Sequence, residues 1–160
     1  MEFDPVLASG VAELADLIGG GQLDRARERA NELLERYPQQ AELWRLLGIC
    51  ALQLGEFAQA QSALGEAFAL APHSVEILCN LASVHTARGA LAEAERVLRR
   101  ALTLEPLHPA ALNNLGSLLD ARGDYHGAAD CFAKSIAQRP DYARAWLNQA
   151  GALLTLRRPG

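Results

Sequence analysis

Lysine is nearly absent from this 160-residue sequence: Lys134 is the only one, although the chain has 14 arginines. The 15 basic and 19 acidic residues give a formal net charge of -4, and the first forty residues carry the clearest acidic excess. Nucleic acids and anionic membrane surfaces attract basic proteins, so we expect neither as the main partner.

Cysteine is also scarce. Cys50, Cys79 and Cys131 are odd in number, lie far apart and form no C-x-x-C pair. This spacing indicates neither a disulfide framework nor a zinc site. We expect three reduced thiols that pack as small hydrophobic groups.

Targeting and membrane signals are missing as well. No apolar run approaches the roughly 20 residues that a membrane-spanning helix needs. Residues 1–5 lack the basic start of a secretory signal. We therefore expect a cytoplasmic protein without a membrane partner, although an exported chain given without its signal would share these features.

No pattern of catalytic or metal-ligating residues is present. The four histidines follow no zinc or catalytic spacing. The glycines at 19–21 are interpreted as a helix stop, because no strand pattern precedes them and no Gly-Lys-Ser/Thr follows. We predict no catalytic residue, no metal site and no cofactor, and interpret the chain as a non-enzyme.

A period of 34 residues runs through the chain instead. Trp44, Leu47 and Gly48 have counterparts 34 and 68 residues later, and a glycine, an alanine and a proline recur at fixed distances behind them. A fixed period of this length indicates stacked structural repeats. The recurring residues are Leu78, Leu81, Ala82, Leu112, Leu115 and Gly116, then Gly55, Gly89 and Gly123, then Ala60, Ala94 and Ala128, then Pro72, Pro106 and Pro140.

These positions resemble the W-x2-L-G-x2-Y, A-x3-F and P pattern of the tetratricopeptide repeat (TPR) family. The resemblance implies an all-α fold: a right-handed TPR superhelix (α-solenoid) of antiparallel helix pairs. We predict a single domain, 1–160, of about four and a half repeats. The repeats are 7–40 (degenerate), 41–74, 75–108, 109–142 and the half repeat 143–156.

Each residue type in the repeat has a physical reason. Gly48 and its counterparts let the two helices of a repeat approach closely. The glycine after each first helix adopts a left-handed backbone at little cost, and the proline prevents the second helix from continuing. Trp44 is expected to be the large buried residue of its repeat.

Asparagine also recurs every 34 residues, at Asn80, Asn114 and Asn148. At about 100° per residue these side chains point roughly 150° away from the face that packs within the repeat. We therefore predict that they line the concave wall built by the first helices. An asparagine amide can match the N–H and C=O of a peptide unit. The alternative is a polar residue on a wet helix face that bonds to a neighbouring helix.

The segments 79–82 and 113–116 resemble the asparagine-ladder TPR arm of O-GlcNAc transferase and its bacterial relatives. That resemblance implies an extended peptide in the groove, with Leu46 and Ala12 interrupting the ladder in the earlier repeats. The predicted peptide-binding residues are Asn80, Ser83, Asn113, Asn114, Ser117 and Asn148.

The predicted function is therefore a protein–protein interaction module that binds a protein or peptide partner. Two alternatives stay open: the substrate-recognition arm of a larger, glycosyltransferase-like enzyme, and a self-assembling scaffold. The last predicted helix has apolar residues on the side that a second helix would cover. We expect either a longer repeat protein or a homo-oligomer formed through Trp146, Leu153 and Leu154.

Overall fold

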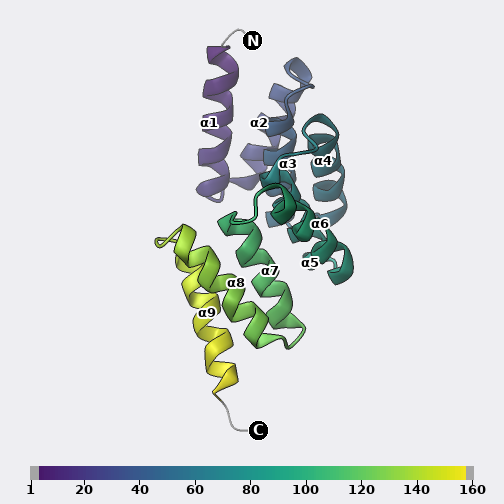
Figure 1. Ribbon diagram of the computed structural model, residues 1–160. Coiled ribbons are helices and arrows are strands. Elements are labelled where there is room, and N and C mark those ends of the chain that lie inside the picture. The colour runs from purple at the N-terminus through teal and green to yellow at the C-terminus, as the bar shows by residue number, and fades with distance from the viewer. Residues whose placement is uncertain (1–3, 158–160) are drawn as a thin grey trace. The chain divides into compact units, whose positions relative to one another are not determined.

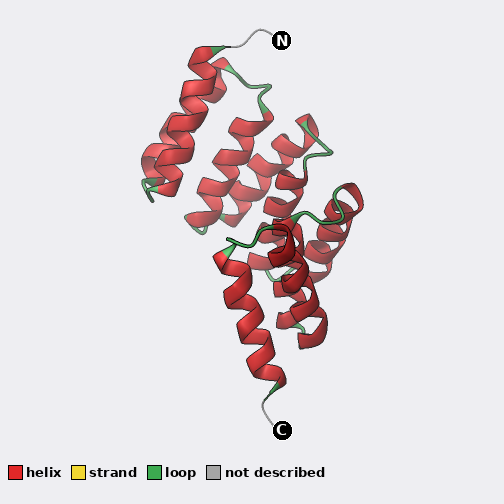
Figure 2. Ribbon diagram, turned by 60° about the vertical axis from the view of Figure 1, so that its left-hand side comes forward, coloured by secondary structure: helices red, strands yellow, loops and turns green. Residues whose placement is uncertain are grey.

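The computed structural model describes residues 4–157, and in this range all regular structure is helical (Figures 1 and 2). Four helix pairs and one further helix follow one another, which confirms the prediction of an all-α fold with about four and a half repeats. The nine helices of the described chain are α1 (Pro5–Gly19), α2 (Leu23–Arg36), α3 (Ala41–Gln53), α4 (Phe57–Leu70), α5 (Val75–Ala87), α6 (Leu91–Leu104), α7 (Pro109–Ala121), α8 (Tyr125–Gln138) and α9 (Ala143–Leu156).

The chain divides into two compact units, Met1–Val84 and His85–Gly160, and the boundary falls inside α5. In the first unit α1 packs on α2, and α3 packs on α1, α2 and α4. In the second unit α7 packs on α6, α8 and α9, and α8 packs on α9. The single domain and the right-handed superhelix both concern how the two units are joined, and they stay predictions.

Glycine with a left-handed backbone ends the first helix of each complete pair. Gly21, Gly55, Gly89 and Gly123 have φ between 71° and 83°, and no other described residue has a positive φ. A side chain with a Cβ is disfavoured in this conformation, which explains the recurrence of glycine. The predicted helix stops are confirmed at these positions.

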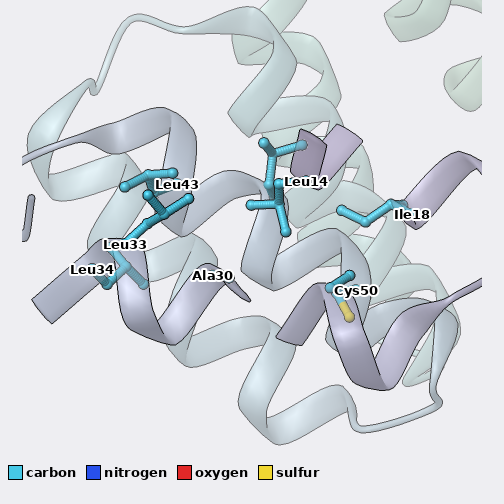
Figure 3. Packing of buried hydrophobic residues seen from close by; sticks show 9 residues of the cluster. Leu14, Ile18, Ala30, Leu33, Leu34, Leu43 and Cys50 are labelled. Carbon is cyan, nitrogen blue, oxygen red and sulfur yellow. The ribbon is translucent and has the colours of Figure 1, made fainter. Parts of the chain in front are cut away.

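The first unit has a continuous apolar core between α1, α2 and α3. Leu14, Leu33, Leu43 and Cys50 are among its buried residues, and Figure 3 shows these side chains in the space between the helices. Leu46 of α3 belongs to the same cluster. The degenerate first repeat is therefore well packed, with small residues at Gly10, Ala26 and Ala30.

The second unit has a smaller cluster of Ala128, Phe132 and Ala152, with Leu119 packed against it. Ser135 is also fully buried, and its hydroxyl donates a hydrogen bond of 2.8 Å to the carbonyl oxygen of Pro109. This bond ties the end of α8 to the start of α7. The last helix is thus seated on α8 through Ala152.

The small residue in the first helix is required where the second helix crosses. A Cβ built on Gly48 would lie 2.5 Å from Leu64 Cγ, and one built on Gly116 would lie 2.6 Å from Phe132 Cε1. Carbon atoms do not approach this closely without displacement. The close approach predicted from the sequence is confirmed at both positions.

The tryptophans are less buried than expected. Trp44 is only partly buried at the edge of the first core, and Trp146 is 52% exposed. In both, the indole N–H donates a 2.8 Å hydrogen bond to a proline carbonyl six residues earlier, at Pro38 and Pro140. The expectation that Trp44 is the buried residue of its repeat is wrong, because the indole lies over the preceding loop.

All three cysteines are free and buried. Burial, as the largest cause, raises the pKa of the Cys50 and Cys131 thiols. The Cys50 thiol also donates to the carbonyl oxygen of Leu23 at 3.0 Å. Thiolate, the reactive form, is therefore disfavoured at these two sites, in agreement with a packing role.

Asp4 links the start of α1 to the end of α2. Its carboxylate accepts hydrogen bonds from the backbone N–H groups of Val6 and Leu7, and from the Tyr37 hydroxyl at 2.7 Å. The Tyr37 hydrogen bond, followed by that of Leu7, holds the pKa of Asp4 below its ordinary value of 3.8. A carboxyl group with a lowered folded-state pKa stabilises the fold above the unfolded-state pKa. That contribution is lost as the pH falls through the folded-state value.

We therefore expect Asp4→Asn to lower the Tm at neutral pH, and the difference from the parent chain to close as the pH falls below about 4. Thermal unfolding followed by circular dichroism over an acidic pH series measures this. Asp16→Asn is the matched control, because the Asp16 side chain makes no hydrogen bond or ion pair within residues 4–157. A Tm difference that stays constant at all pH values would contradict the prediction.

Candidate functional site

The predicted asparagine positions lie on three first helices: Asn80 on α5, Asn114 on α7 and Asn148 on α9. All three side chains are partly exposed. Asn80 belongs to the first compact unit, whereas Asn114 and Asn148 belong to the second. The contacts of the second unit define the clearest part of the candidate site.

Asn148 reaches from α9 to the neighbouring first helix α7. Its Nδ2 donates to Asn113 Oδ1 at 3.1 Å and to Ser117 Oγ at 3.3 Å. The Ser117 hydroxyl in turn donates to the backbone carbonyl oxygen of Asn113 at 3.1 Å. These three residues form a polar network at the seam between α7 and α9.

The network explains why the angular argument from the sequence was incomplete. A direction 150° from the repeat's own second helix is free of that helix, but it points toward the preceding first helix. In the first unit α3 packs on α1, and Leu46, at the position of the asparagines, is buried in the core. For Asn148, the structure supports the alternative of a polar residue that bonds to a neighbouring helix.

Asn113 was predicted among the peptide-binding residues, but its side chain is only 1% exposed. It lies between the helices and accepts the hydrogen bond from Asn148. A direct contact between the Asn113 side chain and a ligand is excluded in this arrangement. Its role is to fix the orientation of the Asn148 amide.

Open polar groups remain on this face after the network is formed. Asn148 Oδ1 and both amide atoms of Asn114 have no hydrogen-bond partner among residues 4–157, and none of them is a fully buried atom. The Ser117 side chain is exposed beside them. The face therefore offers a fixed acceptor on α9 and a free amide on α7.

Small side chains keep the surface around these groups open. Ala121 on α7 and Gly151 on α9 share the helical stripe of the two asparagines, and both are exposed. A Cβ added at Gly151 would meet nothing within 4 Å. The backbone of an extended ligand could approach α9 closely at this position. We call the surface of Asn114, Ser117, Ala121, Asn148 and Gly151 the α7–α9 face.

In the first unit, Asn80 and Ser83 occupy the corresponding stripe of α5. Ser83 donates to the carbonyl oxygen of Cys79 at 3.0 Å. Asn80 Nδ2 is buried and is the one buried side-chain nitrogen or oxygen atom without a partner in the described chain. A buried donor without an acceptor is costly, so Asn80 differs from the satisfied amide of Asn148.

The predicted self-association residues lie together on another side of α9. Trp146, Leu153 and Leu154 are 52%, 45% and 64% exposed. The structure adds Leu147, which is 74% exposed and which the sequence reasoning had left out. We call these four residues the α9 apolar face.

No group of three or more histidine, cysteine, aspartate or glutamate side chains within residues 4–157 is arranged to hold a metal ion. None of the helices of the described chain has both the length and the hydrophobicity of a bilayer span. The sequence-based statements about the secretory signal concern residues 1–3, which lie outside the described residues, and so does Arg158.

The seam network makes a prediction that separates the two asparagines of the α7–α9 face. Asn148→Ala leaves the buried Asn113 Oδ1 without its donor, and is expected to destabilise the chain by about 1–3 kcal/mol. Asn114→Ala removes no hydrogen bond, and is expected to change stability by less than about 0.5 kcal/mol. Urea unfolding of both variants measures the difference. Equal effects of the two substitutions would show that the network contributes nothing.

The sequence matches two family models described as tetratricopeptide repeat. One covers residues 51–119, and the other covers residues 15–60 and 113–160. No curated protein gives a significant match to the sequence.

Solved structures share the fold at low sequence identity. A thermophilic TPR protein of Thermus thermophilus is 23% identical, with a TM-score of 0.85, over 92% of this chain and 81% of that chain. MamA is 22% identical, with a TM-score of 0.69, over 98% of this chain and 86% of that chain. A chain of the APC/C hetero-tetramer Cut9-Hcn1 is 21% identical, with a TM-score of 0.88, over 94% of this chain and 30% of that chain.

Proposed function

The chain belongs to the tetratricopeptide repeat family, and we propose that it is an interaction module that binds an extended peptide segment on the α7–α9 face. Proteins of this family generally mediate protein–protein interaction and are typically non-catalytic. The proposal adds the location of the contact and the form of the ligand.

The orientation of the Asn148 amide carries this proposal. Its Nδ2 is held by Asn113 and Ser117, so Oδ1 is left as an oriented acceptor at an accessible surface. A peptide N–H is the natural donor for such a group. Asn113, although buried, supports binding because it positions Asn148.

The spacing of the two asparagines suits an extended chain. Adjacent packed helices lie about 8–10 Å apart, which equals about three extended residues at roughly 3.3 Å each. Asn148 would accept from one backbone N–H while Asn114 pairs with a peptide group about three residues away. Contacts of this kind recognise the backbone, so we expect broad sequence tolerance with small side chains facing Gly151.

The full asparagine ladder is a further part of the proposal. It adds Asn80 and Ser83, whose partly exposed side chains occupy the same stripe of α5. The alternative of a substrate-recognition arm in a larger enzyme uses the same residues and differs only in what the bound peptide serves. The cytoplasmic location and the lack of nucleic-acid binding also stay predictions.

A peptide selection with a blocked variant tests the proposal. A phage library of random ten-residue peptides is selected on the immobilised chain, and the enriched peptides are then measured against Gly151→Phe. The new ring points into open space, so it should block the face without disturbing the fold. We expect at least a tenfold loss of affinity, equivalent to about 1.4 kcal/mol.

The matched control is Gly65→Phe on α4, where a Cβ also meets nothing within 4 Å. It should bind the selected peptides like the parent chain. The proposal fails if no peptide is enriched, or if both phenylalanine variants bind equally well.

Self-association is a second candidate function, and the α9 apolar face favours it. Contiguous large hydrophobic side chains on a soluble surface usually mark an interface. Sedimentation velocity across a wide concentration range tests it, with Leu153→Glu as the variant expected to stay monomeric. A parent chain that is monomeric throughout would refute this candidate while leaving peptide binding untouched.

A further inference from the structure

The terminal helices carry charges of opposite sign. Asp4, Glu13 and Asp16 are the only charged residues from the N-cap to the end of α1, and all are acidic. Arg144 is the only charged residue within α9, and Arg157 forms its C-cap. The same polarity holds for the compact units. The first has twelve acidic and five basic residues, and the second has seven acidic and ten basic residues.

A depression lies beside the acidic residues of α1. It has a volume of about 500 Å³, and its lining includes Ala12, Glu13, Asp16 and Leu17 of α1 together with Arg25 of α2. Glu13 also pairs with Arg29 at 3.0 Å, whereas Asp16 makes no ion pair in the described chain. The depression thus has apolar walls and an acidic rim with an unneutralised carboxylate.

The α9 apolar face offers the complementary features. Trp146 and Leu154 project large exposed side chains, and Arg144 and Arg157 lie on the same helix and its cap. We propose that the α9 apolar face of one copy docks on the α1–α2 depression of a second copy, head to tail. The inference rests on the second candidate function above, and it names the surface that α9 meets.

Charge decides between this contact and a symmetric one. If α9 packed on α9 across a two-fold axis, the same arginines of both copies would face one another, and no acidic residue of α9 could pair with them. If α9 packs on α1, Arg144 and Arg157 meet Glu13 and Asp16. Opposite charges across an interface favour encounter and fix the partner. A head-to-tail contact leaves one donor and one acceptor surface free, so chains of copies grow with concentration.

Two blocked variants test the arrangement. Leu153→Glu/Leu154→Glu blocks the α9 apolar face, and Ala12→Arg/Asp16→Arg blocks the depression. All four side chains are exposed, so both variants should fold, which circular dichroism checks. We expect each variant alone to be monomeric in sedimentation velocity, and an equimolar mixture to form dimers and nothing larger. The parent chain should pass beyond the dimer.

A control with the same change in net charge is Glu66→Arg/Ala69→Arg on the exposed side of α4, which should associate like the parent chain. Association of the parent chain should weaken as NaCl is added, because salt screens the charge pairs. If the depression-blocked variant still dimerises alone and the mixture gives no new species, the contact is symmetric, and only the head-to-tail inference fails. If the parent chain never associates, the second candidate function fails with it.

Discussion

Gly116→Ala is expected to destabilise the chain by about 1–3 kcal/mol, although alanine is normally the better helix former. The added methyl would lie 2.6 Å from Phe132 Cε1 and 3.0 Å from its Cζ. Phe132 is 1% exposed and has no free space into which it could rotate. Urea unfolding of the variant measures the loss.

Matched glycines show that the effect depends on position. Gly65→Ala and Gly151→Ala add a methyl where nothing lies within 4 Å, and should stabilise by about 0.5–1 kcal/mol. Phe132→Leu should reduce the penalty at Gly116, because the preceding repeat has alanine and leucine at the equivalent positions 82 and 98. The account of close packing is wrong if Gly116→Ala is as stabilising as the two exposed substitutions.

Leu14→Ala is expected to cost about 2–5 kcal/mol of unfolding free energy. Leu14 is 0% exposed and lies in the core of the first unit, where Figure 3 shows it between the helices. The removal of its side chain leaves a cavity that the surrounding leucines fill only in part. The loss would make the first repeat the weakest part of the chain.

The two tryptophans show how far that loss spreads. Trp146→Phe leaves Trp44 as a fluorescent reporter of the first unit, and Trp44→Phe leaves Trp146 as a reporter of the second. Neighbouring repeats stabilise one another, so we expect Leu14→Ala to lower the urea midpoint seen by both reporters. An unchanged transition at Trp146 would show that the two units unfold independently, against the prediction of a single domain.

Helices and turns could be predicted well from the sequence because they depend on local chemistry. The left-handed backbone at Gly55 or Gly123 requires glycine whatever surrounds it. The close approach at Gly48 is also encoded locally, as a small residue at a fixed place in the period. These features repeat because each repeat meets the same geometric demand.

The candidate site depended on contacts between repeats, and there the sequence was less informative. Asn113 occupies the position of the buried Cys79 in the preceding repeat. A polar residue at a buried position needs a partner, and this signal could have indicated the bond to Asn148. The burial of Trp44 was overestimated for a similar reason. Residue size indicates a large contact but does not show whether a core or a loop provides it.

The exposed side of α9 was predictable because it follows from helical periodicity alone. Leu147 was missed since it lies at the margin of the stripe formed by Trp146, Leu153 and Leu154. The charge difference between α1 and α9 is also visible in the sequence. Its meaning depends on the depression between α1 and α2, which only the structure shows.

The most direct test of peptide binding on the α7–α9 face is a nuclear magnetic resonance titration of the chain with the tightest peptide from the selection. The side-chain amide signals of Asn114 and Asn148 and the backbone amide of Gly151 are followed, with exposed Asn31 of α2 as the internal control. The account predicts that the first three signals shift together and saturate with one peptide, while Asn31 stays unchanged. Shifts confined to α8, or to residues away from α7 and α9, would contradict it.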